Sequence, residues 1–152
     1  MGSRRCGWES RHRGHQSGFT LVELIIVMAV VVTLATIAIP KFLRARFNTN
    51  ESAAIATLKT CASALESFRA AQTPPAYPAD LTELSDADPQ YASESVTDGV
   101  TQGYTFDYVQ VGDNEYALTA APEMDGVTGT RVFYVDESGV IRLDDENGEP
   151  VQ

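Results

Sequence analysis

The sequence predicts an α+β fold in which one long N-terminal helix packs, by its second half, on a small four-stranded antiparallel sheet. An apolar run over 21–39 carries a single charge, Glu23. Apolar residues then recur at helical spacing as far as Phe68, and after residue 103 the apolar period changes to two. With 152 residues, the chain has room for one small domain and one dedicated segment.

The long helix is expected over 19–71, about 80 Å if it is straight. Pro40 predicts a kink, because proline removes one helical hydrogen bond. The residues of one face fall in its second half: Phe47, Ala54, Leu58, Cys61, Leu65 and Phe68. The polar residues between them are assigned to the outer side: Asn50, Glu51, Lys59, Glu66 and Arg69. Glu66 and Arg69 are expected to form a weak pair there.

The rest of the chain divides into three predicted segments. Residues 72–103 read as an acidic connecting loop, with one possible helical turn at Asp80 to Leu84. The sheet is expected over 104–143, with Tyr104, Phe106 and Tyr108 on one face of its first strand and Tyr116, Leu118 and Ala120 on one face of its second. Residues 144–152 read as an acidic C-terminal tail, frayed from Gly148 onward.

The charges are unevenly distributed. The formal net charge is -10, but residues 1–18 carry a net positive charge whereas residues 74–152 hold only two bases among many acids. This balance does not predict nucleic acid as the main partner. If residues 1–18 are removed, the only histidines, His12 and His15, go with them, and a histidine-dependent nucleophilic or zinc site is excluded.

We therefore expect that this protein is not an enzyme and that it has no catalytic residues, no cofactor and no metal site. The acidic run 144–148 does not fit the EF-hand pattern, since placing Gly148 sixth puts Leu143 at the first ligand position. A calcium site of another kind in this region stays open.

The apolar run is long enough to cross a bilayer, at roughly 28 Å as a helix. A carboxylate within it costs about 2.5 to 3.5 kcal/mol at the helix centre. Two explanations of Glu23 are open. In the first, its carboxylate reaches the lipid headgroups and has no other role. In the second, a cut between Gly18 and Phe19 creates an α-amino group that neutralises the carboxylate, either within one subunit or between stacked helices.

A family resemblance follows from these residues. Gly18 followed by Phe19-Thr20-Leu21-Val22-Glu23-Leu24-Ile25-Ile26-Val27, and then by Ala38-Ile39-Pro40, resembles the processing signal of type IV pilins and type II secretion pseudopilins. The resemblance implies a pilin-like fold, a leader over 1–18, and a membrane or filament core over 19–40. It further implies cleavage between Gly18 and Phe19 by a prepilin peptidase, N-methylation of Phe19, and a docking role for Glu23 during assembly.

The function implied is that of a type IV prepilin, polymerised with other pilin subunits at an inner-membrane assembly platform. The chain would first cross the inner membrane once, with its leader cytoplasmic and its C-terminal domain periplasmic, and then enter an extracellular or periplasmic filament. The disulfide loop common in that family is absent, and Cys61 is expected to be a small buried hydrophobe.

Three further alternatives remain open. The first is a type II secretion pseudopilin that drives protein export, rather than a subunit of a pilus used for adhesion or motility. A secretory signal cut near Ala38 would instead release a soluble acidic binding module. Finally, Lys41, Arg44 and Arg46 either face acidic domains of neighbouring subunits or form a plain juxtamembrane belt.

Overall fold

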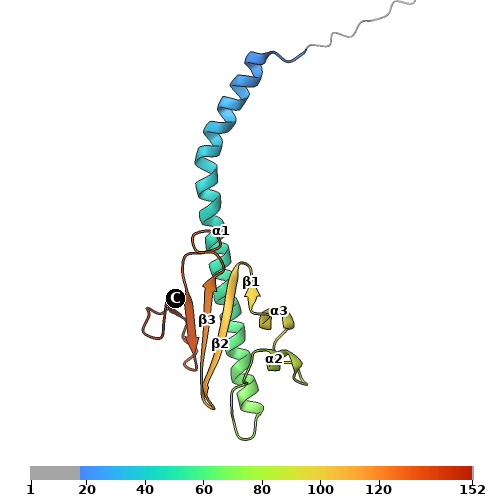
Figure 1. Ribbon diagram of the computed structural model, residues 1–152, viewed down its shortest axis with the longest axis vertical. Helices are drawn as coiled ribbons and strands as arrows, with labels where there is room; N and C mark the ends of the chain where they lie inside the picture. Colours follow the sequence, from blue (N-terminus) through green and yellow to red (C-terminus); the bar gives the residue numbers. More distant parts are fainter. Residues whose placement is uncertain (1–17, 152) are drawn as a thin grey trace, which may run out of the picture. The chain divides into compact units, whose positions relative to one another are not determined.

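The computed structural model describes residues 18–151. One helix, α1, runs over Leu21–Ala71 and continues through Pro40. The chain forms two compact units, the first ending at Ala38 and the second beginning at Ile39. The second unit holds the lower part of α1, a sheet and two short helices (Figure 1). The α+β class and the long helix are therefore confirmed.

The sheet has five antiparallel strands in the order β1-β2-β3-β4-β5, one more than the sequence predicts. Their bounds are Val100–Thr101 (β1), Tyr104–Gly112 (β2), Glu115–Pro122 (β3), Phe133–Asp136 (β4) and Arg142–Leu143 (β5). The additional strand is β1, which pairs with the start of β2. Gln102 and Gly103 both adopt positive φ, and this tight turn is what folds two residues back onto the sheet.

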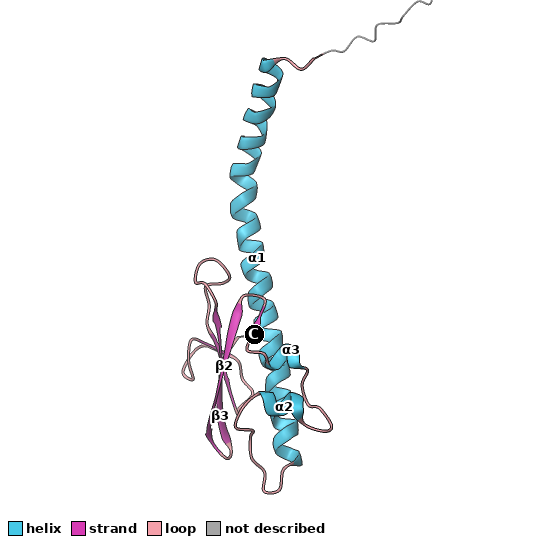
Figure 2. Cartoon of the chain, turned by 45° about the vertical axis from the view of Figure 1, so that its right-hand side comes forward, coloured by secondary structure: helices cyan, strands magenta, loops and turns pink. Residues whose placement is uncertain are grey.

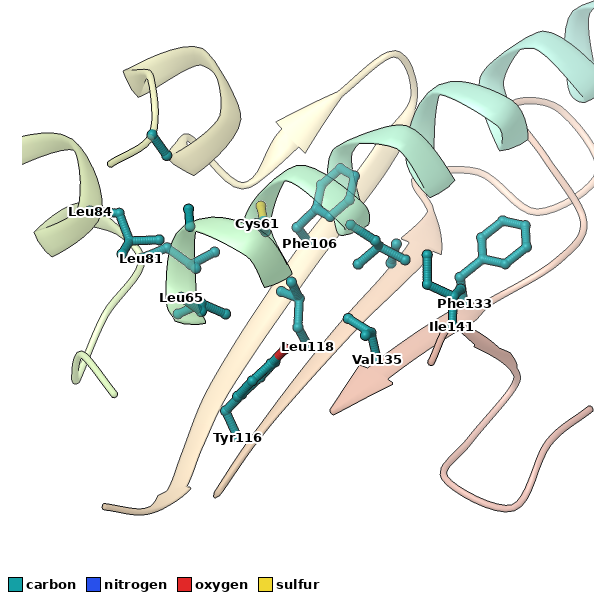
Figure 3. Packing of buried hydrophobic residues seen from close by; sticks show 14 of the residues in the cluster. Cys61, Leu65, Leu81, Leu84, Phe106, Tyr116, Leu118, Phe133, Val135 and Ile141 are labelled. Atoms are coloured by element: carbon teal, nitrogen blue, oxygen red, sulfur yellow. The ribbon is translucent and has the colours of Figure 1, made fainter. Parts of the chain in front are cut away.

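The core lies between one face of this sheet and the part of α1 that runs from Ala54 to Phe68 (Figures 2 and 3). Five of the six helix residues predicted to share a face are buried, and Phe47 is half-buried. The predicted alternation of the strands is also confirmed: Tyr104, Phe106, Tyr116, Leu118 and Ala120 are buried, and Tyr108 is half-buried. Each leucine or phenylalanine buried here contributes about 1.5–3 kcal/mol to folding.

The segment 72–103 is more ordered than the predicted loop. It contains two short helices, α2 (Thr82–Asp86) and α3 (Glu94–Thr97), the first of which overlaps the predicted helical turn. Tyr77, Leu81 and Leu84 are buried in the core. No regular period in the sequence predicts their burial, because Tyr77 lies in an irregular stretch and α2, which begins after Leu81 and contains Leu84, is only five residues long.

Residues 148–151 are held by hydrogen bonds, in contrast to the predicted fraying from Gly148 onward. The Val151 N–H donates to the Ile141 carbonyl at 2.8 Å, and the Leu143 N–H donates to the Glu149 carbonyl at 3.0 Å. Gly148 permits this return, since a Cβ there would lie 1.6 Å from the Leu143 carbonyl oxygen. The acids at 144–146 are exposed.

Two polar helix residues assigned to the outer side are buried instead. The Asn50 amide donates to the Thr128 carbonyl at 2.7 Å, and Glu51 accepts the Arg131 Nε–H at 2.8 Å. The prediction failed because helical spacing alone does not show that the β3–β4 connection folds over this turn of α1. The predicted Glu66–Arg69 pair is present, at 3.7 Å.

Candidate processing and assembly site

Gly18 and Phe19 lie just before the start of α1. Both are exposed, Phe19 to 89%. Among the described residues, and apart from the chain neighbours of Gly18, no heavy atom lies within 4 Å of where a Cβ would stand on Gly18. The Gly18–Phe19 peptide bond is thus outside regular structure and free of packing, as an endopeptidase requires of its substrate.

The helix start is built by Thr20 and Glu23, which cap each other. The Glu23 N–H donates to Thr20 Oγ1 at 3.2 Å, and the Thr20 N–H donates to Glu23 Oε2 at 2.8 Å. The Thr20 hydroxyl also donates to Glu23 Oε2, at 2.8 Å. This is a capping box, in which two backbone N–H groups without helical partners are satisfied reciprocally.

The capping box assigns Glu23 a role that neither sequence-based explanation contained. Its carboxylate lies in the first turn, where the positive end of the helix dipole also stabilises a negative charge. The threonine three residues before the glutamate, directly ahead of an apolar run, is the sequence signature that would have predicted it. Among the described residues, the bonds to Glu23 use Oε2, so Oε1 remains available to another donor.

Within residues 18–151, nothing covers the apolar part of α1. None of its most apolar residues is buried, and by length and composition this helix could cross a membrane. Thr33 and Thr36 do not interrupt the apolar surface, because their hydroxyls donate to the carbonyls of Ala29 and Val32. An exposed apolar surface of this extent is typical of a membrane-contacting or protein–protein interface.

A group of basic residues follows the apolar surface directly. Lys41, Arg44 and Arg46 are exposed, and the ion pairs of the described residues include none of them. Pro40 lies within α1 at the start of this group, and the kink it predicts stays a prediction.

Cys61 is remote from this site and lies in the core, free of any disulfide. Burial raises the pKa of its thiol to about 11, so it is inert at neutral pH. Within residues 18–151, no three histidine, cysteine, aspartate or glutamate side chains gather as metal ligands.

Comparison with known proteins agrees with this geometry. Residues 13–39 match the family model described as the prokaryotic N-terminal methylation motif. The chain therefore carries a pilin-type N-terminal segment, and its resemblance to the type IV pilin family is confirmed.

A particular relative is the type IV major pilin protein PilA of Myxococcus xanthus (strain DK1622), which is 42% identical over 59 residues. This match covers 39% of the chain but 27% of the relative, so the chain spans about a quarter of that protein's length. No solved structure gives a significant match.

Proposed function

We propose that this protein is the structural subunit of a type IV pilus or a pilus-like filament, with no catalytic role. The observation that carries the proposal is the methylation motif at the start of an apolar helix whose apolar part no other described residue covers. The major pilin relative favours the pilus over the type II secretion apparatus. Polymerisation through residues 19–40 would bury this surface among copies of the same helix.

Processing takes place at the exposed Gly18–Phe19 peptide bond, which precedes the capping box. A prepilin peptidase cuts between Gly18 and Phe19, removes residues 1–18 and methylates the new amino group of Phe19. Thr20 and Glu23 keep the helix start intact after the cut, because their mutual hydrogen bonds involve no atom of the leader.

Glu23 then serves two purposes in sequence. In the membrane-inserted subunit, Thr20 satisfies Oε2 and lowers the cost of a carboxylate near the bilayer. During assembly, the free Oε1 accepts from the α-amino group of a neighbouring subunit, which places each new helix at a fixed height. The subunit waits in the inner membrane with its acidic unit outside, and an assembly platform moves it into the filament.

The deciding experiment is intact mass with N-terminal sequencing of the protein from its native membrane. We expect a terminus at Phe19 that is one methylene heavier than the free residue, and filaments by electron microscopy. Gly18→Val should abolish the cut, whereas Gly14→Val, in the same leader, should leave it unchanged. A terminus near Ile39 would show a secreted soluble protein and overturn the proposal.

Glu23→Gln separates charge from capping. The glutamine oxygen still accepts from the Thr20 N–H, so the helix start and the cut after Gly18 should persist while filament yield falls. Thr20→Val removes the hydroxyl alone and tests the cap with the charge intact. Normal filaments from Glu23→Gln would show that the carboxylate is there for capping only.

A further inference from the structure

The β3–β4 connection over 123–132 forms an ordered loop at the upper end of the second unit (Figure 1). Within it, the Val127 and Thr128 N–H groups both donate to the Met124 carbonyl, and the Gly126 N–H donates to the Gly129 carbonyl. The Met124 N–H donates to Thr128 Oγ1 at 3.1 Å. These bonds fix the loop's shape without any partner.

The loop is also fastened to the rest of the unit from two sides. On α1, Asn50 and Glu51 hold Thr128, Thr130 and Arg131. On β2, the buried Tyr104 hydroxyl donates to the Arg131 carbonyl at 2.9 Å. A side chain as costly to bury as Glu51 is thus used to hold a surface loop in place.

The tip held in this way is apolar and acidic. Met124 and Val127 are 55% and 53% exposed, and Glu123 and Asp125 beside them are exposed as well. The salt bridges of the described residues involve neither acid. A rigid tip loses little conformational entropy on binding, so its contacts convert efficiently into affinity.

The matching surface is on α1, in residues 41–46, which we call the collar. Lys41, Arg44 and Arg46 supply positive charge, and Phe42, 69% exposed, supplies apolar area. In its own chain the loop is fastened at residue 50, about 9 Å along the helix from Arg44, and makes no ion pair with the collar among the described residues. Each surface therefore lacks a partner of the opposite charge.

We propose that the tip of the β3–β4 loop of one copy docks on the collar of the next copy, pairing Glu123 and Asp125 with the collar bases and Met124 with Phe42. The two surfaces differ, so the contact is heterologous, the kind of contact that builds an open filament when successive rotations do not close a ring. This proposal rests on the proposed filament. The loop–collar contact lies outside the apolar helix core of that filament, and it would set the register between the second units of neighbouring copies.

The test compares charge reversals in the full chain expressed in its native membrane. Reversing the loop (Glu123→Lys with Asp125→Lys) or the collar (Lys41→Glu with Arg44→Glu) should each lower filament yield roughly tenfold, because like charges then face each other. Combining the two pairs should restore the yield. Glu146→Lys with Glu149→Lys changes the net charge by the same amount at exposed acids elsewhere and should have little effect.

A cross-link tests proximity directly. Arg44→Cys and Asp125→Cys, made in separately tagged chains and expressed together, should give a disulfide-linked dimer that contains both tags, and each alone should give none. Circular dichroism of each variant in detergent verifies that the second unit is folded.

The outcomes are distinct. If the wild type is uncut and forms no filaments, the proposed function fails. If wild-type filaments form but the loop reversal has no effect and the combined reversal restores nothing, the loop contact is wrong. If, in that case, the collar substitutions lower the filament yield and the loop substitutions do not, the collar bases bind anionic lipid headgroups instead.

Discussion

Glu51 shows how one buried carboxylate organises a distant part of this chain. Its side chain is 5% exposed, and its two oxygens accept from Thr130 and Arg131, 79 and 80 residues further on. Arg131 itself is 48% exposed. The Glu51–Arg131 ion pair is therefore partly exposed to solvent. Its main effect is to give the buried Glu51 carboxylate a hydrogen-bond donor and to hold the β3–β4 loop on α1.

Glu51→Gln should lower the free energy of unfolding by about 1–3 kcal/mol, since the amide cannot accept the Arg131 and Thr130 donors equally well. Urea unfolding of the full chain in detergent measures it. Glu137→Gln, an exposed acid in the same unit, should change stability by less than about 0.5 kcal/mol. Equal effects of the two substitutions would show that Glu51 contributes only net charge.

Cys61 should react slowly with maleimide in the folded protein. Its pKa of about 11 leaves roughly a hundredfold less thiolate than an ordinary thiol, and burial slows access further. The measurement needs a Cys6→Ser background, with Thr105→Cys, at an exposed strand position, as the reactive reference. Comparable labelling rates at the two sites before unfolding would contradict the buried position.

The β3–β4 loop depends, as an element, on one close approach. A Cβ on Gly129 would lie 2.2 Å from the Tyr104 hydroxyl oxygen, which donates to the Arg131 carbonyl. Glycine is needed here for space, and its φ is not in the left-handed region.

Gly129→Ala should therefore displace Tyr104 and lower the free energy of unfolding by about 1–3 kcal/mol, as overpacking does. Gly112→Ala is the matched control, because nothing lies within 4 Å of its Cβ position. Thermal unfolding followed by circular dichroism compares them. The docking contact predicts a second effect of Gly129→Ala, a lower filament yield.

At the scale of the whole molecule, several tyrosines of the second unit have a higher pKa than free tyrosine. Burial raises the pKa of Tyr104 and of Tyr108 to about 12, and burial also raises the pKa of Tyr77 and Tyr116. Among the described residues, the Tyr116 hydroxyl is a buried polar group without a hydrogen-bond partner, which makes its ionisation in the core especially unfavourable.

The free energy of unfolding should therefore fall as the pH rises. The folded state binds these protons more tightly than the unfolded chain, so the stabilisation is complete below about pH 10 and is lost between about pH 10 and 12. Urea unfolding at a series of alkaline pH values, with phenolate absorbance recorded in parallel, measures both. Phenolate appearing near pH 10 while the protein stays folded would contradict it.

The sequence by itself determined the long helix, its apolar face, the alternating strands, and the methylation motif over 13–39, within which the cut after Gly18 and the roles of Phe19 and Glu23 stay predictions. These features depend on local spacing or on a short contiguous pattern, and local spacing is preserved whatever the rest of the chain does. The capping box is also encoded locally, by a threonine and a glutamate three residues apart at Thr20 and Glu23, and the structure shows its hydrogen bonds.

Only the tertiary structure decided the burial of Asn50 and Glu51, the fifth strand, the order within 72–103 and the return of the C-terminus to β5. Each depends on contacts between residues far apart in the chain, such as the 80 positions between Glu51 and Arg131. Polar residues carry no period that marks them as buried, because what buries them is a partner whose place the fold alone sets.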